Sequence, residues 1–272
     1  MDENDVLRSK KKLEMLKAMQ LPCYDNGKRF TVTTKLDKIS ELLKDTSYRE
    51  IKGDLFRLYT KVPASELEPE KTICLSSHAD FVKAIKKPFV QKQDDKTLLG
   101  TFDNSATNAA ALYLLLEGSL PDNVVVAFTG NEEHGMNGAL ELDRFFYTHS
   151  AGQPFYFAMD VTDLGFGKKQ FSIENTFSVP KGDLDNIIKI AKEVDFQGYL
   201  YPKALPDEAY QYAALGAQSC SLCVPTTGPM HSNEGCFMEL EAYLGYIDVV
   251  MNIAQRFSPS PSIAVEAPIP IR

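Results

Sequence analysis

Apolar residues along the chain follow two patterns, short continuous runs and longer segments with helical spacing, and the two alternate. The continuous runs are bounded by turn-forming residues, so they predict buried strands. They lie within residues 71–80 (KTICLSSHAD), 123–130 (NVVVAFTG), 154–161 (PFYFAMDV) and 217–225 (AQSCSLCVP). Residues 28–35 and 54–62 alternate apolar and polar positions, which predicts two half-buried strands with a helix between them.

In the other segments, apolar residues recur three and four positions apart, as on one face of a helix. Gly118 and Gly216 each follow such a segment, and we expect them to end the helices. The predicted helices lie near residues 6–19, 104–118, 138–149, 184–194, 207–216 and 239–257. Strands that alternate with helices predict an α/β sheet with helices on both faces. No repeat or linker divides the chain, so we expect one domain over residues 1–257 and a Pro-rich tail over residues 258–272.

Composition narrows the possible partners. The formal net charge is -8, which argues against nucleic-acid or anionic-membrane partners because nothing neutralises phosphate in bulk. Five cysteines without dense spacing favour buried thiols over a disulfide framework. No run reaches the ~20 apolar residues of a membrane span, and the first residues lack an apolar signal core. We therefore expect a cytoplasmic protein.

Four polar residues follow the predicted strands at the points where those strands end. They are His78, Glu132, Glu133 and Asp160. Open α/β sheets bind ligands at the carboxyl ends of their strands, so we expect these side chains to lie near one another. Asp80, two positions after His78, could share its side of an extended chain and hold the imidazole tautomer.

Two adjacent glutamates in one pocket repel each other unless cations compensate or one takes a proton, so this pair favours a metal. Asp103 precedes a predicted helix, where it could cap the helix or bridge two cations. His231 lies in a Gly/Pro-rich loop that can position an imidazole without regular structure. Nitrogen and oxygen donors without a thiolate suit catalytic zinc, with cobalt or manganese as possible replacements.

Five segments in order resemble the metal-site motifs of the co-catalytic di-zinc exopeptidases. They are SSHAD (76–80), GTFDN (100–104), VVAFTGNEEHGMNGA (125–139), AMD (158–160) and PMHSNEG (229–235). The resemblance covers about residues 70–255 and implies a zinc-exopeptidase-like catalytic domain built on a mixed, largely parallel sheet. The third segment is the most specific. A glycine that often follows the DN pair in the single-domain aminopeptidase branch is missing here.

The resemblance implies a role for each residue and two Zn²⁺ ions per chain. Asp103 would bridge the two ions, and the peptide bond after it is often cis in such proteins. His78 and Asp160 would complete one site, and Glu133 and His231 the other. Glu132 would be the general base, and Asp80 would orient His78. Asp207 or Glu208 would support the site, although Asp207 could also be a plain helix cap.

The resemblance favours an aminopeptidase acting on a peptide or aminoacyl substrate. The segments 78–103 and 160–231 leave no room for the lid domain that some relatives insert. A carboxypeptidase usually needs a cation, often Arg, for the terminal carboxylate, and Arg144 is the only arginine between His78 and His231. A carboxypeptidase or N-acyl-amino-acid deacylase remains the alternative among enzymes. An inactive metal-binding relative is the alternative from another class.

Overall fold

The computed structural model describes residues 3–25, 29–150, 152–167, 171–194 and 198–260. Its helices are α1 (Glu3–Ala18), α2 (Thr33–Leu43), α3 (Ser105–Glu117), α4 (Asn137–His149), α5 (Lys181–Lys192), α6 (Glu208–Ala214) and α7 (Leu240–Arg256). Among the described residues, no helix has both the length and the apolar character that a membrane crossing requires.

The strands form one large sheet and one small hairpin. The hairpin pairs β1 (Tyr24–Asp25) with β2 (Arg29–Phe30). The large sheet has β3 (Arg49–Lys52), β4 (Phe56–Thr60), β5 (Ile73–His78), β6 (Val90–Lys92), β7 (Thr97–Gly100), β8 (Val124–Thr129), β9 (Phe155–Thr162), β10 (Phe171–Glu174), β11 (Gly198–Tyr201), β12 (Ser219–Thr227) and β13 (Cys236–Glu239).

The large sheet is mixed, with a parallel centre. Its main order is β3-β4-β8-β5-β9-β12-β13-β7-β6, and β10 joins β12 to β11. The four strands β8, β5, β9 and β12 run parallel to one another, while antiparallel pairs extend the sheet on both sides. The predicted fold class is confirmed, and the four continuous apolar runs are these four central strands.

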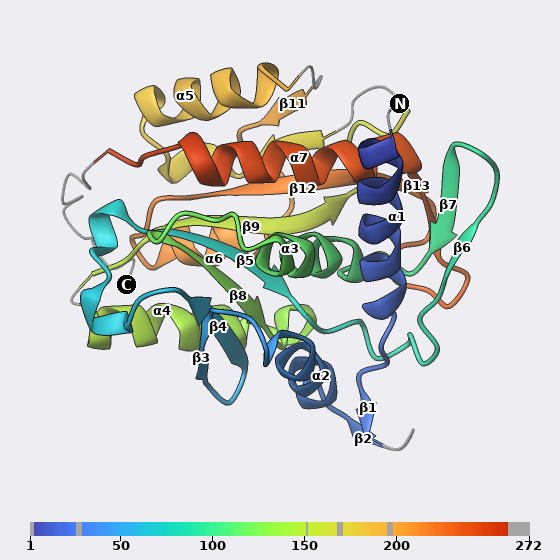
Figure 1. The fold of residues 1–272 in the computed structure, drawn as a ribbon, viewed down its shortest axis with the longest axis horizontal. Helices are drawn as coiled ribbons and strands as arrows, with labels where there is room; N and C mark the ends of the chain where they lie inside the picture. Colours follow the sequence, from blue (N-terminus) through green and yellow to red (C-terminus); the bar gives the residue numbers. More distant parts are fainter. Residues whose placement is uncertain (1–2, 26–28, 151, 168–170, 195–197, 261–272) are drawn as a thin grey trace, which may run out of the picture.

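Side chains of the central strands alternate between two apolar layers, as the pleat requires. In β8, Val124, Val126 and Phe128 enter the larger core, whereas Val125 and Ala127 enter the smaller one. On the larger side α3 and α7 contact the sheet, with α1 packed on α3 and α5 on α7 (Figure 1). On the other side α4 contacts β8 and α6 contacts β9. Because both faces are covered, the strands read as continuous apolar runs rather than as alternating ones.

Some local predictions were wrong. Residues 28–35 do not form one strand: β2 ends at Phe30 and α2 begins at Thr33, so only the start is extended. The short strands β3, β6, β7, β10, β11 and β13 were not predicted, because three or four residues carry too little periodicity. Gly118 and Gly216 have φ of +64° and +92°, in the left-handed region expected after a helix. The tail prediction lies outside the described residues from residue 261 onward.

Candidate metal centre

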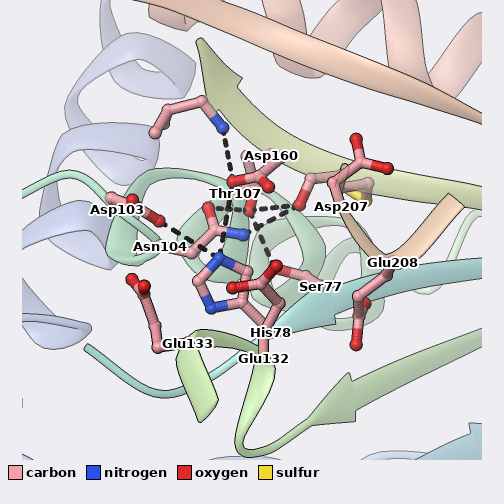
Figure 2. A network of polar contacts seen from close by, with 12 residues as sticks. Ser77, His78, Asp103, Asn104, Thr107, Glu132, Glu133, Asp160, Asp207 and Glu208 are labelled. Atoms are coloured by element: carbon pink, nitrogen blue, oxygen red, sulfur yellow. Dashed lines mark hydrogen bonds and ion pairs between the residues drawn. The ribbon is translucent and has the colours of Figure 1, made fainter. Parts of the chain in front are cut away.

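The predicted site residues that Figure 2 labels converge at the carboxyl ends of the central strands; they are His78, Asp103, Glu132, Glu133 and Asp160. His78 is the last residue of β5. Asp160 lies in β9, two residues before that strand ends, rather than at its end as expected. The glutamate pair opens a short 3-10 helix, Glu132–His134, directly after β8. Parallel neighbours bring these ends together, because β5 pairs with both β8 and β9.

One group of possible ligands is formed by His78, Asp103 and Asp160. Nε2 of His78 lies 3.1 Å from Oδ1 of Asp103 and 3.5 Å from Oδ1 of Asp160. The His78 side chain is 2% exposed, and that of Asp160 is 16% exposed. The group is therefore almost closed to solvent.

A second group is formed by Asp103, Glu133 and His231. Nε2 of His231 lies 2.8 Å from Oδ2 of Asp103 and 3.8 Å from Oε1 of Glu133. The His231 side chain is 55% exposed, so this group faces solvent. Asp103 presents one oxygen to each histidine and belongs to both groups. Within each group the possible ligand atoms lie within 4.8 Å of one another.

Asp80 connects the first histidine to the glutamate pair. Its carboxylate accepts hydrogen bonds from the backbone N–H groups of Glu132 (3.1 Å) and Glu133 (3.3 Å). Its Oδ1 lies 3.7 Å from Nδ1 of His78, a distance too long for a hydrogen bond. The other ring nitrogen of His78, Nε2, faces Asp103 and Asp160. Asp80 is fully buried, so this contact is shielded from water.

The loop that carries the glutamates needs an unusual backbone. Asn131, Gly135 and Met136 have φ of 61°, 109° and 56°. Gly138 packs so closely that a β-carbon there would lie 2.4 Å from the backbone nitrogen of Gly130. Both glycines of this loop are thus required, Gly135 for a left-handed turn and Gly138 for a close approach.

A polar network supports Asp103, and sequence reasoning did not identify it. Asn104 donates to the carbonyl of Met159, at 2.8 Å, and Thr107 donates to the same oxygen, at 3.0 Å. Ser77 and Thr107 share a hydrogen bond of 2.8 Å. Asp103 does not cap α3, and the bond between Asp103 and Asn104 is cis, as the resemblance implied. The sequence signal that could have identified this network is the group of polar residues at the start of the otherwise apolar helix α3.

Asp207 and Glu208 lie beside the centre rather than in it. Asp207 caps α6 by accepting from the backbone N–H of Tyr210, as one of the two interpretations predicted. Glu208 accepts hydrogen bonds from Ser76 and Thr129, on β5 and β8. Burial raises the pKa of Asp207 to about 6 and that of Glu208 to about 7.

Burial and like charges raise the pKa of both glutamates of the pair. The pKa reaches about 9 for Glu132, where the carboxylates of Asp160 and Glu133 add to the effect of burial. The pKa of Glu133 reaches about 7, with Asp103 adding to burial. In the absence of cations, this pocket therefore holds protons at neutral pH, as the repulsion between carboxylates requires.

The two histidines are shifted in the protonated direction. Burial alone would lower the pKa of His78, but the carboxylates of Asp160 and Asp103 outweigh it and raise the pKa well above its usual value. The hydrogen bond to Asp103 raises the pKa of His231 to about 9. Burial would raise the pKa of Asp103 itself, yet the hydrogen bond from His231 and the charge of the nearby His78 hold it below its usual range.

The donor set fits two divalent cations. Oδ1 of Asp103 and Oε1 of Glu133 are buried and accept no hydrogen bond, an arrangement that is costly without a cation. Each group offers one imidazole and two carboxylates, the mixture typical of catalytic zinc. Cations at both positions would also relieve the repulsion that raises the glutamate pKa values.

No protein-family model matches the sequence, and no curated protein is similar to it by sequence. Solved structures match the fold along nearly the whole chain. A TET aminopeptidase from a Thaumarchaeota archaeon has a TM-score of 0.71 and 12% identity, covering 91% of this chain and 96% of that chain. Aminopeptidase PepT from Bacillus cereus has a TM-score of 0.64 and 13% identity, covering 90% and 98%. A Thermotoga maritima protein named endoglucanase has a TM-score of 0.64 and 11% identity, covering 88% and 96%.

The structural neighbours thus include TET and PepT aminopeptidases and a zinc aminopeptidase from Bacillus subtilis, and this protein shares the mixed α/β fold of the first two.

Proposed function

We propose that this protein is a metal-dependent hydrolase of peptide bonds, most specifically an aminopeptidase, with residues 1–257 as one catalytic domain. His78, Asp103 and Asp160 would hold one Zn²⁺ ion, and Asp103, Glu133 and His231 the other. The observation that carries the proposal is the position of Asp103, whose two oxygens face two different histidines. A carboxylate that only capped a helix would have no reason to lie between them.

When bound, the two ions would lower the pKa of a shared water and polarise the substrate carbonyl. Glu132 would accept the proton of that water and deliver it to the leaving amine. Asp80 would keep His78 oriented and hold the glutamate pair in place through the two backbone N–H groups.

Two features support aminopeptidase over carboxypeptidase or deacylase activity. Arg144 is an exposed residue of α4. Among the described residues between the motifs, no separate lid domain is inserted.

Metal analysis combined with a substrate panel tests the proposal. Zinc-loaded protein should bind close to two equivalents and cleave aminoacyl amides with a free N-terminus. Peptides blocked at the N-terminus should be resistant, whereas a block at the C-terminus should matter little. The opposite dependence would favour a carboxypeptidase, and cleavage of N-acyl amino acids a deacylase.

The Glu132→Gln variant is the matched control, because it should bind the same zinc and lose about 10²–10⁴ in turnover. Zinc binding without cleavage of any peptide by the wild type would indicate an inactive relative. Cleavage of cellulose alone would instead assign the activity that the Thermotoga protein's name indicates. Folded protein that binds no zinc would exclude the proposed mechanism.

A further inference from the structure

The solvent-exposed side of the centre is bordered by a loop that carries three lysines. His231, at 55% exposure, marks this side, because the other ligand side chains are at most 16% exposed. The lysine loop, residues 81–89, connects Asp80 to β6. Lys83, Lys86 and Lys87 are all exposed in it.

The lysine loop is fixed to the loop of His231 by Asn233. The Asn233 side chain accepts from the backbone N–H of Lys86, at 3.2 Å, and donates to the carbonyl of Ala84, at 2.7 Å. Asn233 is two residues from His231, so these bonds place the backbone of the lysine loop beside the exposed ligand. The contact is therefore part of the rim of the centre and not a distant surface feature.

The same loop also reaches the glutamate side of the rim. The ammonium group of Lys83 lies 5.8 Å from the centre of the Phe30 ring, and Tyr24 donates to the carbonyl of Lys83, at 2.5 Å. The Phe30 ring in turn lies 5.4 Å from the ring of His134, the residue after Glu133. The lysine loop thus contacts both the Phe30 region beside the glutamate loop and the loop of His231.

The positive charges of the three lysines are not neutralised by an ion pair within the part of the chain that the structure describes. By contrast, Lys92 in the adjacent strand forms an ion pair with Asp95. Glu234 is an exposed acid in the His231 loop, but the lysines outnumber it. Such a local excess of positive charge is unexpected on a chain with a net charge of -8.

We propose that Lys83, Lys86 and Lys87 bind a carboxylate of the substrate, so that the preferred substrates are short peptides bearing a negative charge. The carboxylate comes either from an acidic side chain or from the C-terminus of the peptide. This inference rests on the proposed function for the position of the peptide, and it identifies a source of positive charge other than Arg144. Lysines on a solvent-exposed rim attract a carboxylate electrostatically and do not form the bidentate hydrogen bonds that arginine forms. The selectivity for charged peptides therefore depends on ionic strength.

The test uses zinc-loaded, full-length protein and three peptides, Ala-Ala-Glu-amide, Ala-Ala-Gln with a free C-terminus, and Ala-Ala-Gln-amide. The rim variant combines Lys83→Gln, Lys86→Gln and Lys87→Gln. The control combines Lys181→Gln, Lys189→Gln and Lys192→Gln on α5, which has the same change in charge on a helix packed against α7.

In the rim variant, KM should rise about tenfold for one of the two charged peptides, with kcat little changed. A tenfold weaker affinity corresponds to about 1.4 kcal/mol of binding free energy. A rise for the Glu amide identifies the side chain as the source, and a rise for the free acid identifies the C-terminus. The uncharged peptide should respond equally in the wild type and both variants. Salt should raise KM for the preferred peptide in the wild type and much less in the rim variant.

Binding of N-acetylated versions of the same peptides, measured by calorimetry, separates this inference from the proposed function. If the protein cleaves no peptide but binds the charged ones through the rim lysines, the proposed function fails and the anion site stands. If the rim and control variants bind and cleave all three peptides alike, the inference is overturned.

Discussion

The two halves of the candidate centre share Asp103 but differ in how the fold supplies the rest. His78 and Asp160 come from two central parallel strands, and the His78 side chain is 2% exposed. His231 comes from a loop and Glu133 from the short 3-10 helix between β8 and α4, and the His231 side chain is 55% exposed. The sheet therefore fixes one half in advance, whereas loop packing sets the other and leaves it open to solvent. A preorganised, buried set of ligands should bind its cation more tightly, and the open half should receive the substrate.

The largest effect should follow from Asp103→Asn, which affects both halves at once. The neutral amide loses the charge that attracts both cations. Zinc binding should weaken at both positions by more than the 10–100-fold that loss of a supporting partner typically costs. Equilibrium dialysis against a zinc buffer measures this. Loss of only one equivalent would show that Asp103 is not shared.

The next prediction separates the two glutamates. Glu132→Gln should retain both zinc ions and lose about 10²–10⁴ in turnover, because an amide cannot accept a proton. Glu133→Gln should weaken zinc binding in the open half, and excess zinc should restore part of its activity. Turnover and bound zinc are measured for both variants across a zinc titration. If zinc rescues Glu132→Gln and not Glu133→Gln, the two roles must be exchanged.

Comparing the two histidines tests the difference in burial directly. In metal-free protein His78→Ala removes the positive partner of buried carboxylates and should cost about 3 kcal/mol of unfolding free energy. His231→Ala alters a half-exposed side chain and should cost much less. Each variant should retain about one equivalent of zinc. Urea unfolding in the presence of a chelator gives the stabilities, and equal costs would contradict the contrast between the halves.

The smallest effect should be the pH dependence of the metal-free protein. His78 and His231 have a folded-state pKa above their unfolded value, so they contribute stability that is lost as pH rises through the folded pKa, near 9 for His231. The raised pKa values of Glu132 and Glu133 act in the same direction, because the folded state binds protons that the unfolded state has released. Stability should therefore fall between about pH 5 and pH 9.

Thermal unfolding with a chelator measures this fall, at about 2–4 °C for each kcal/mol lost. Zinc should displace the bound protons, so the rise in Tm on adding zinc should be larger at pH 8 than at pH 6. His231→Ala should reduce the slope above pH 6.5. Stability that rises with pH in the chelated protein would contradict the assigned directions.

The sequence by itself determined the central strands, most helices and the residues of the candidate centre. Continuous apolar runs such as residues 123–130 are long enough to identify a buried strand, and polar residues at their ends point to the binding edge of the sheet. Gly118 and Gly216 end helices for a local reason, their left-handed backbone. Such features depend on neighbouring residues, so they are visible without the fold.

Tertiary structure decided what depends on distant residues. Whether Asp103 caps α3 or faces two histidines is settled by packing between β5, β9 and the His231 loop, and a single carboxylate satisfies both sequence patterns equally. The bonds of Asn104 and Thr107 to Met159, and of Asn233 to the lysine loop, join segments more than 50 residues apart. The unequal burial of the two histidines has the same origin, because exposure depends on which segments pack over a side chain and not on its neighbours in sequence.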